Sequence, residues 1–306
     1  SGSSANLIAT AALRHLHGTV VAGWHEVIVP AIAWATTYAP FQQHGFKLVV
    51  VDVDPATLNV DVQQVAAAIG PRTIGIAGVS ILGNPAPLDE LCRLCYAHDL
   101  FFFEDNCESL GAILEGQRCG SFGDVGTLSF FFSHHLNTVE GGAVLTNDDH
   151  LRDLLVCLRA HGWTRDLPPN SPLRPFVEVD DLSYYYNFVL PGYNVRPTEL
   201  AAAVGRVQLA RQEEFAISRR ENATLFRNLF AEDPRWTIQH TVSADAQPVP
   251  FGFTLVFNSP EARMLAARAM AETGIEHRLI TGGSFAKHPV ANCYNWRYAR
   301  KEGTPV

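Results

Sequence analysis

The sequence lacks the features that mark several other classes of protein. None of its apolar runs is long enough to cross a bilayer, and no stretch has the pattern of a secretory signal peptide. Internal repeats, low-complexity segments and long blocks of one charge are absent, and the formal net charge is −8. Such a charge makes nucleic acid an unsuitable partner. We therefore expect a cytoplasmic globular protein that binds neither nucleic acid nor membrane.

Cysteine is scarce, with six residues in a chain of 306. Cys92 and Cys95 form a C-x-x-C pair, but they lie within Leu88 to His98, whose apolar spacing predicts a helix. Two cysteines on such a helix are more often small core residues than metal ligands, although spacing alone leaves both interpretations open. We expect reduced thiols, as in a cytosolic enzyme, and no metal site.

The stretch from 101 to 147 carries most of the chemistry. An apolar run that starts at Phe101 ends in an acid at Asp105, as a buried parallel strand does where its carboxyl end meets a ligand. A second apolar run, Val125 to Phe132, is followed by Ser-His-His, and a short third strand is expected from Gly142 to Thr146. Three strand ends would then bring an acid, two imidazoles and a hydroxyl to one rim of a sheet.

Strands and helices alternate along the chain, which predicts an α/β fold with a mostly parallel sheet. Further strands are expected at 26–30, 48–53 and 73–79, and helices at 60–69 and 151–160. After a join near residue 215, the pattern predicts a strand at 251–257, a helix at 262–273 and another strand at 274–280. We therefore expect a large domain at 1–215 and a smaller one at 216–306.

The stretch from 101 to 147 resembles the sugar aminotransferase family (the DegT/DnrJ/EryC1/StrS family) of pyridoxal phosphate (PLP) enzymes, which act on nucleotide-linked 4-keto sugars. That family reads Glu-Asp-x-Ala-x-x-x-Gly, Gly-x-x-Gly-Asp, Ser-Phe-x-x-x-Lys and Gly-Glu-Gly-Gly, and most of these positions are kept. This chain has His134 at the family's Schiff-base lysine, Cys107 at its alanine and Val139 before the last motif. The resemblance implies PLP fold type I, with a seven-stranded sheet and a small α+β C-terminal domain. Both chain ends look shortened relative to the family.

His134 is the most informative departure, because a Schiff base needs a primary amine, which imidazole lacks. The exchange, with the His134-His135 doublet, resembles the family's 3-dehydratase branch, whose members hold pyridoxamine phosphate (PMP) noncovalently. The resemblance implies that His134 acts as the base while a nucleotide-linked 4-keto-6-deoxy sugar loses its C3 hydroxyl, and that glutamate restores the cofactor amine. An imidazole with a near-neutral pKa suits that role. His135 is expected to contact the substrate.

The resemblance also assigns residues to the cofactor ring. Asp105 would keep the pyridine nitrogen protonated, so that the ring accepts electrons. Trp34 would stack on the ring, and Glu108 would contact its oxygen. From sequence alone, Trp34 reads equally well as a core residue and Glu108 as a solvated loop acid.

Four further residues fall at the family's phosphate positions. Ser3 and Ser4 lie in Ser-Gly-Ser-Ser at the start of a predicted helix, where backbone N–H groups and the helix dipole favour an anion. Ser129 is the second phosphate position, and Asn194 reaches the cofactor of the neighbouring subunit in the family, which implies a homodimer with a shared active site. As alternatives, the serines are a plain N-cap and a strand residue, and Asn194 is a turn residue.

Two expectations concern the substrate and a second cofactor. Arg278 lies in a segment that faces the sugar in the dehydratases, and it would bind the nucleotide diphosphate or the glutamate carboxylate, with a solvent-facing arginine as the equal alternative. One member of the branch carries an iron–sulfur cluster, with cysteines after the histidine-containing strand. The matching region, Ala160 to Val179, contains no cysteine. We therefore expect no cluster.

Two other functions stay open at this level. The chain could be a PLP-dependent nucleotide-sugar aminotransferase whose lysine was lost or substituted, or a non-catalytic relative that binds cofactor without turnover. The intact residues around His134 favour the dehydratase.

Overall fold

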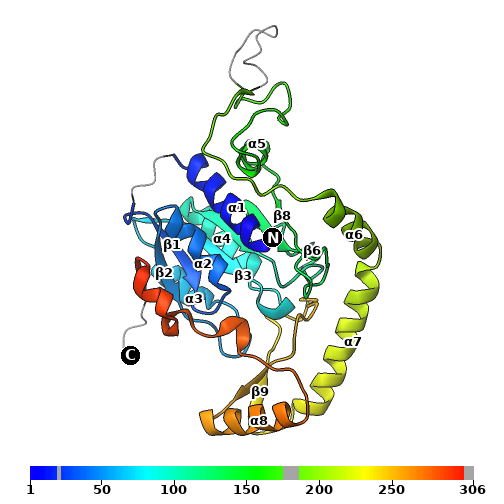
Figure 1. Cartoon of the computed structure of the whole chain (residues 1–306). Helices are drawn as coiled ribbons and strands as arrows, with labels where there is room; N and C mark the ends of the chain where they lie inside the picture. The colour runs from blue at the N-terminus through cyan, green and yellow to red at the C-terminus, as the bar shows by residue number, and fades with distance from the viewer. Residues whose placement is uncertain (19–21, 175–185, 300–306) are drawn as a thin grey trace.

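The computed structural model describes residues 1–18, 22–174 and 186–299 (Figure 1). Its helices are α1 (Gly2–Leu16), α2 (Ala35–Gln43), α3 (Val62–Ala68), α4 (Leu88–His98), α5 (Asp149–Arg159), α6 (Glu199–Ala210), α7 (Gln212–Phe230) and α8 (Pro260–Glu272). Short 3-10 helices are η1 (Ile81–Gly83), η3 (Ile280–Gly282), η4 (Phe285–Lys287) and η5 (Pro289–Cys293). The strands are β1 (Glu26–Pro30), β2 (Lys47–Val51), β3 (Thr73–Val79), β4 (Phe101–Asp105), β5 (Ile113–Leu114), β6 (Gln117–Arg118), β7 (Val125–Ser129), β8 (Gly142–Leu145), β9 (Trp236–Ile238), β10 (Leu255–Phe257) and β11 (Trp296–Tyr298).

The centre of the fold is a seven-stranded sheet with the order β11-β2-β1-β3-β4-β7-β8. Neighbouring strands run parallel except for β8, which is antiparallel to β7. The predicted α/β fold with a mostly parallel seven-stranded sheet is therefore confirmed. Every residue of β1, β4 and β7 is buried, which explains why these strands read as continuous apolar runs rather than alternating ones.

Helices cover both faces of the sheet. The core on one face joins Leu13 of α1, Phe41 of α2 and Leu154 of α5 to the strands. The core on the other face contains Val65 of α3 and Leu91 of α4 (Figure 1). This arrangement leaves the carboxyl ends of the central strands free to carry a site, as the sequence predicts.

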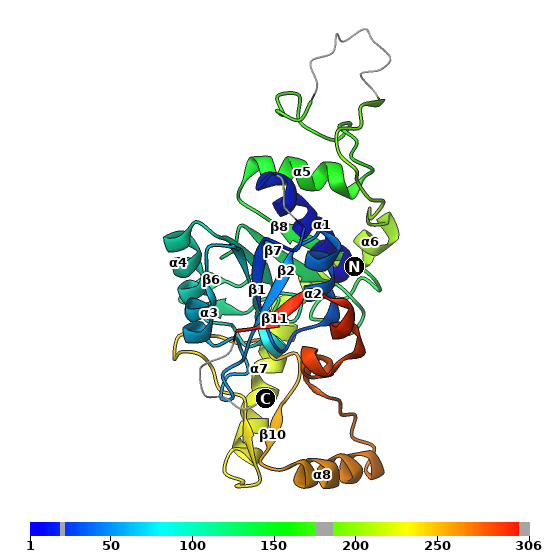
Figure 2. The ribbon, with the colours of Figure 1, turned by 90° about the vertical axis from the view of Figure 1, so that its left-hand side faces the viewer.

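The second half of the described chain leaves the sheet and then returns to it. Helix α7 runs from the large sheet toward the antiparallel pair β9–β10 and α8, which lie apart from the sheet in both views (Figure 2). Phe226 of α7 stacks on Phe253 with ring centroids 4.9 Å apart. Strand β11 then pairs with β2, with Trp296 opposite Leu48. The division at residue 215 stays a prediction, and the structure adds that β11 belongs to the large sheet.

The strand expected from Gly274 to Ile280 is wrong. Residues 274–279 follow α8 without regular structure, and Ile280 starts η3. Glu276, His277 and Arg278 are exposed. Three consecutive exposed polar side chains bury no face against a sheet, so the local pattern offers too little to hold a strand there.

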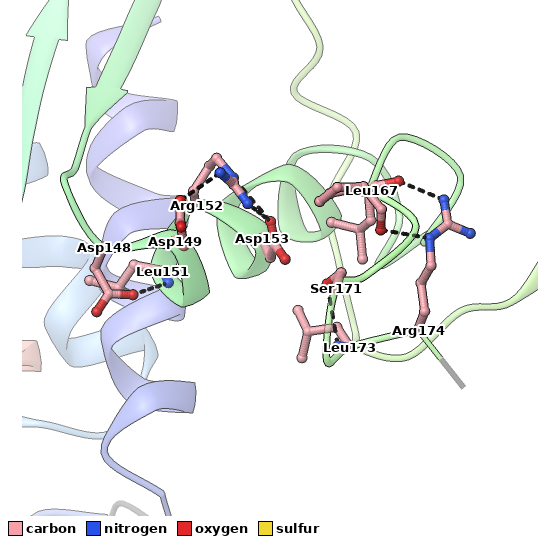
Figure 3. Close-up of polar contacts among 10 residues, drawn as sticks. Asp148, Asp149, Leu151, Arg152, Asp153, Leu167, Ser171, Leu173 and Arg174 are labelled. Atoms are coloured by element: carbon pink, nitrogen blue, oxygen red, sulfur yellow. Dashed lines mark hydrogen bonds and ion pairs between the residues drawn. The ribbon is translucent and has the colours of Figure 1, made fainter. Parts of the chain in front are cut away.

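The segment that follows α5 is described as far as Arg174. The Arg174 guanidinium donates hydrogen bonds to the carbonyl oxygens of Leu167, at 2.6 Å, and Pro168, at 3.1 Å (Figure 3). These bonds close the described part of the loop on itself beside α5. Residues 175–185 lie outside the described part of the chain.

None of the described helices is long and apolar enough to span a membrane.

Candidate active site

Asp105 occupies the carboxyl end of the central strand β4 and is buried, with 4% of its surface exposed. One carboxylate oxygen accepts hydrogen bonds from Asn6 Nδ2 at 2.9 Å and from Thr37 Oγ1 at 2.8 Å. The other accepts a bond from the backbone N–H of Cys107 at 3.2 Å. Helices α1 and α2 thus each supply one side chain that fixes the acid, because a buried carboxylate without partners would be costly.

The surroundings of Asp105 fit a ligand with a protonated ring nitrogen. A carboxylate has about four acceptor positions, and the described residues occupy three of those of Asp105. Asn6 Oδ1, beside it, is buried and lacks a hydrogen-bond partner among the described side chains and backbone. Acceptors with spare capacity at a strand end are what an N–H or O–H group of a cofactor would need.

Glu108 lies in the turn that follows Asp105. Its Oε2 accepts a hydrogen bond of 2.8 Å from the backbone N–H of Leu82 in η1. Burial raises the pKa of Glu108 to about 7, against the opposing effect of the Leu82 N–H, while the nearby charge of Asp105 raises it further. Glu108 is therefore partly protonated near pH 7. It is hydrogen-bonded to η1 and is not a solvated loop acid.

The start of α1 packs directly against the end of β7. A Cβ atom placed on Gly2 would lie 2.6 Å from the Cβ of Ser129, so this contact requires glycine. Ser4 donates its backbone N–H to the N-cap Ser1 Oγ at 3.1 Å, and Ser3 Oγ lies 3.0 Å from Thr36 Oγ1. The residues predicted to bind phosphate at the helix start and in β7 therefore lie near the same contact between α1 and β7. The positive dipole end of a long helix suits an anion there.

Trp34 precedes α2 with an extended backbone, and 56% of its surface is exposed. An indole this exposed is not a core residue, which removes one of the two alternatives that the sequence leaves open. The ring is available to cover a flat ligand.

His134 follows β7 in a turn that is closed by a hydrogen bond from its backbone N–H to the Phe131 carbonyl oxygen. Its ring packs edge-on against Phe251, with centroids 4.9 Å apart. Nδ1 is buried and has no partner in the part of the chain that the structure describes. Burial lowers the pKa of His134, an effect opposed by the charge of Asp105 and reinforced by that of Arg219. The imidazole is therefore neutral at pH 7 and able to accept a proton.

His135 has a different environment from its neighbour. It is 5% exposed, and its Nε2 lies 2.8 Å from the carbonyl oxygen of Val249, so the imidazole donates there. Burial lowers its pKa to about 4, with the charge of Arg219 adding to the effect. The contact with substrate that the sequence analysis expects of His135 stays a prediction. The contact that the structure shows is to the segment around Val249.

Asn194 lies on the surface, where its Oδ1 accepts a hydrogen bond of 3.2 Å from Arg196 Nε. A groove of about 790 Å³ runs between the start of α1, β8 and α5, and Ser4, Arg196 and Thr198 line it. The segment of Asn194 and the start of α1 thus border one open space. The contribution of Asn194 to a neighbouring subunit stays a prediction.

Arg278 is exposed, and its Nη2 lies 3.0 Å from Glu276 Oε1. Its positive charge also lowers the pKa of Glu108, against burial. Arg278 is therefore close enough to the Asp105 turn to act on it electrostatically, while its side chain stays open to a ligand.

Cys92 and Cys95 lie on α4, as predicted, and their thiols donate weak hydrogen bonds to the carbonyl oxygens of Phe122 and Phe101. No group of three potential metal-ligating side chains occurs within residues 1–18, 22–174 and 186–299. The expectation of a chain without an iron–sulfur cluster stays a prediction.

Sequence reasoning gave no role to several residues that shape the site. Asn6 and Thr37 both hold Asp105, and Phe251 and Arg219 both act on His134. Asn6 stands in the Ser-Gly-Ser-Ser-Ala-Asn-Leu run and could have been found as an amide among the small and apolar residues that follow the serines. The other three come from distant segments and carry no local signal.

Comparisons with known proteins agree with this geometry. The model of the DegT/DnrJ/EryC1/StrS aminotransferase family matches residues 1–301. The chain is 43% identical to the GDP-4-keto-6-deoxy-D-mannose 3-dehydratase of Yersinia pseudotuberculosis over 290 residues, which cover 94% of this chain and 73% of that protein.

Two solved structures are similar over nearly the whole chain. The Escherichia coli GDP-4-keto-6-deoxy-D-mannose-3-dehydratase with bound hydrated PLP aligns with a TM-score of 0.92 at 37% identity, covering 98% of this chain and 77% of that one. A GDP-4-keto-6-deoxymannose-3-dehydratase with a trapped PLP-glutamate geminal diamine aligns with the same TM-score and identity, covering 98% of this chain and 78% of that one.

The fold and the site define a PLP-dependent enzyme of the aminotransferase superfamily. Within that class, the chain belongs to the DegT/DnrJ/EryC1/StrS aminotransferase family.

Proposed function

We propose that this chain catalyses the PMP-dependent removal of the C3 hydroxyl from a GDP-linked 4-keto-6-deoxyhexose. The observation that carries the proposal is the imidazole of His134, which follows β7 with a buried Nδ1 that no described residue bonds, at the place of the family's Schiff-base lysine. The relative with 43% identity, named as a GDP-4-keto-6-deoxy-D-mannose 3-dehydratase, supports the choice of sugar and nucleotide.

The positions of the lysines support noncovalent binding of the cofactor. The chain has three, Lys47, Lys287 and Lys301. Lys47 lies 3.6 Å from Glu26, at the amino end of β1, whereas the site lies at the carboxyl ends, about 13 Å along a five-residue strand. Lys287 is an exposed residue of η4, and borohydride trapping tests directly whether it forms a Schiff base with the cofactor.

Asp105 and its two helix partners would face the pyridine nitrogen, and the exposed ring of Trp34 would lie against the face of the cofactor. Glu108 would meet the ring oxygen. When bound, PMP supplies the amine that condenses with the C4 ketone and the ring that accepts electrons. The protein's contribution is to hold the Asp105 carboxylate in place through Asn6, Thr37 and the backbone N–H of Cys107.

Phosphate binding would fall to the start of α1. Ser3, Ser4 and Ser129 surround the place where Gly2 meets β7. Asn194 of the partner subunit would complete this site, which makes the enzyme a homodimer. An anchored phosphate would hold the cofactor in register with His134 without a covalent bond.

His134 would accept a proton from the reacting centre and return it to the departing C3 hydroxyl. Its depressed pKa keeps it neutral before reaction, and its contact with Phe251 fixes the ring. Arg278 would bind the diphosphate of the substrate or the carboxylate of glutamate. Glutamate would restore the amine of the cofactor, and one similar structure contains a trapped PLP-glutamate geminal diamine. The free cysteines suit the reducing cytoplasm, where we place the enzyme.

The test supplies purified protein with PMP, glutamate and GDP-4-keto-6-deoxymannose, and follows products by mass spectrometry. We expect a 3-deoxy sugar, and a loss of about 10²–10⁴-fold in its rate for His134→Asn. Spectra recorded with PLP and then glutamate should show conversion to PMP without a borohydride-stable protein adduct.

Two outcomes would overturn the proposal. An amino sugar as the product, or a borohydride-stable adduct on the protein, would identify an aminotransferase. Tight binding of PMP without any product would identify a non-catalytic relative.

A further inference from the structure

A short segment from the C-terminal half, Pro248–Phe251, contacts both His134 and His135. We call it the bridge segment. The carbonyl oxygen of Val249 accepts the hydrogen bond from His135 Nε2 at 2.8 Å. The ring of Phe251 packs on that of His134, with centroids 4.9 Å apart and an interplanar angle of 63°. The position of the bridge segment therefore determines where the two imidazoles lie.

The bridge segment is held on its η1 side by two backbone hydrogen bonds. Val249 N–H donates to the Gly83 carbonyl oxygen at 3.0 Å, and Phe251 N–H donates to that of Leu82 at 2.8 Å. A Cβ atom on Gly83, whose φ is +84°, would lie 1.9 Å from the Val249 carbonyl oxygen, so the approach is close. Leu82 in turn donates to Glu108, which links the bridge segment to the Asp105 turn.

Helix α7 holds the bridge segment from the opposite side. Arg219 Nη1 donates a hydrogen bond of 2.8 Å to the Pro250 carbonyl oxygen, and Arg220 Nε donates a longer one, of 3.3 Å, to that of Pro248. Pro250 has no backbone N–H of its own, so the bond to Arg219 is the polar anchor of this residue toward α7. Arg219 thus fixes the residue between Val249 and Phe251, the two that touch the histidines.

We propose that Arg219 is a positioning residue for His134: it fixes the bridge segment that supports the imidazole and presents its guanidinium to the histidine pair. The inference rests on the proposed function, because it concerns the base of that reaction. Arg219 reaches His134 through Pro250 and Phe251.

The charges around His134 give Arg219 a second effect. The guanidinium lowers the pKa of both histidines, in addition to the larger effect of burial. Asp105 acts in the opposite direction on His134, and the charge of His134 in turn lowers the pKa of His135. Glu108, whose own pKa is about 7, lies beyond the bridge segment at Leu82. Arg219 is therefore a cation that opposes the effect of Asp105 and, together with the larger effect of burial, favours the neutral form of His134.

Three variants separate the two effects. Arg219→Met removes charge and hydrogen bond together, while Arg219→Lys keeps the charge and loses the planar guanidinium that reaches the Pro250 carbonyl oxygen. Arg220→Met is the matched control, since Arg220 neighbours Arg219 on α7 and also bonds the bridge segment, but pairs with Glu213 rather than acting on the histidines.

The experiment measures the pKa of His134 by NMR in cofactor-free protein with labelled histidine rings, with the signal assigned by its loss in His134→Asn. We expect Arg219→Met to raise this pKa by about 0.5–1 pH unit, and Arg219→Lys and Arg220→Met to leave it within about 0.2 unit. The acid limb of kcat should move upward with the pKa in Arg219→Met. In Arg219→Lys, kcat should fall about tenfold with KM unchanged.

The inference is overturned if Arg219→Met leaves the pKa of His134 in place, or if Arg220→Met shifts it equally. Should Arg219→Met fail to fold, Arg219→Lys decides, because wild-type kcat in that variant contradicts a positioning role. The NMR readout needs no turnover. An enzyme that gives no 3-deoxy product thus refutes the proposed reaction and leaves the coupling of Arg219 to His134 to be judged separately.

Discussion

Arg297 Nη2 lies 2.8 Å from Oε2 of Glu26, so a side chain of the last described strand is paired with a carboxylate of the first. Glu26 is 1% exposed and also pairs with Arg72 at 2.8 Å and Lys47 at 3.6 Å. One buried acid therefore joins three cations from separate segments. The cluster lies at the amino ends of the strands, away from the candidate site.

Replacing Glu26 by glutamine should lower the free energy of unfolding by about 2 kcal/mol, because charge-assisted hydrogen bonds are lost while the partly exposed cations regain some hydration. Urea denaturation measures this. The matched control is Glu276→Gln, which removes an exposed pair with Arg278 and should change stability by less than about 0.5 kcal/mol. Equal effects of the two substitutions would contradict the assignment.

The contribution of Glu26 should depend on pH. Burial raises its pKa, but the hydrogen bond and charge of Arg297, together with Arg72 and Lys47, outweigh burial and lower the pKa from its ordinary 4.5. A depressed folded-state pKa stabilises the native state above the unfolded value and is lost as the pH falls through the folded one. The stability difference between wild type and Glu26→Gln should therefore be constant from pH 7 to 5 and shrink below about pH 4.5. A constant difference down to pH 3 would refute this.

Glu108 should act with the opposite sign. Because burial raises its folded pKa to about 7, the native chain keeps a proton that the unfolded chain has released above 4.5. Its contribution to stability thus declines as the pH rises from about 4.5 to 7. Glu108→Gln removes the decline, so its stability relative to wild type should rise across this window in urea titrations at several pH values. Glu104, whose pKa is also about 7, is present in both proteins and cancels. Parallel curves would rule out the assignment.

Gly2→Ala should weaken PMP binding about tenfold, because the new Cβ would lie 2.6 Å from the Cβ of Ser129 and push the start of α1 away from β7. Fluorescence titration of the apoprotein measures the Kd. Gly70→Ala is the control, since a Cβ there meets no atom within 4 Å. An unchanged Kd in Gly2→Ala would mean that the helix start does not hold the phosphate.

The acid limb of kcat/KM should lie below pH 6.5, the ordinary pKa of histidine. Burial lowers the pKa of His134, and Arg219 adds to this against the charge of Asp105. A base with a depressed pKa stays unprotonated further into acid, so the midpoint of the acid limb should lie below pH 6.5. A pH–rate profile with PMP at saturation tests this, and an acid limb above 6.5 would show that another group limits the rate.

Local patterns predicted much of the large sheet. Buried strands such as β1, β3 and β4 stand out as apolar runs between turns, and Asp105 stands out as a charge at the end of one of them. The resemblance assigned Ser129 and the serines of the helix start to one phosphate, and the contact between Gly2 and Ser129 gives their closeness a physical basis.

Contacts between distant segments were beyond the reach of the sequence. Asn6 and Thr37 become partners of Asp105 because two helices dock on one strand end, and no periodicity reports such docking. The contact of Phe251 with His134 and the return of β11 to the sheet are of the same kind. The strand wrongly predicted after α8 is the opposite case. Its local pattern is compatible with a strand, but the segment pairs with no other strand that the structure describes and is irregular.

The pairing of β11 with β2 has a consequence for how the protein is made. Trp296 lies opposite Leu48, so about 250 residues must leave the ribosome after β2 before this edge of the sheet can close. Until then, β2 presents an unpaired apolar edge, the kind of surface that invites association between nascent chains. Completion of the domain is thus a late event, and a chaperone that shields β2 during translation would raise the yield of folded enzyme.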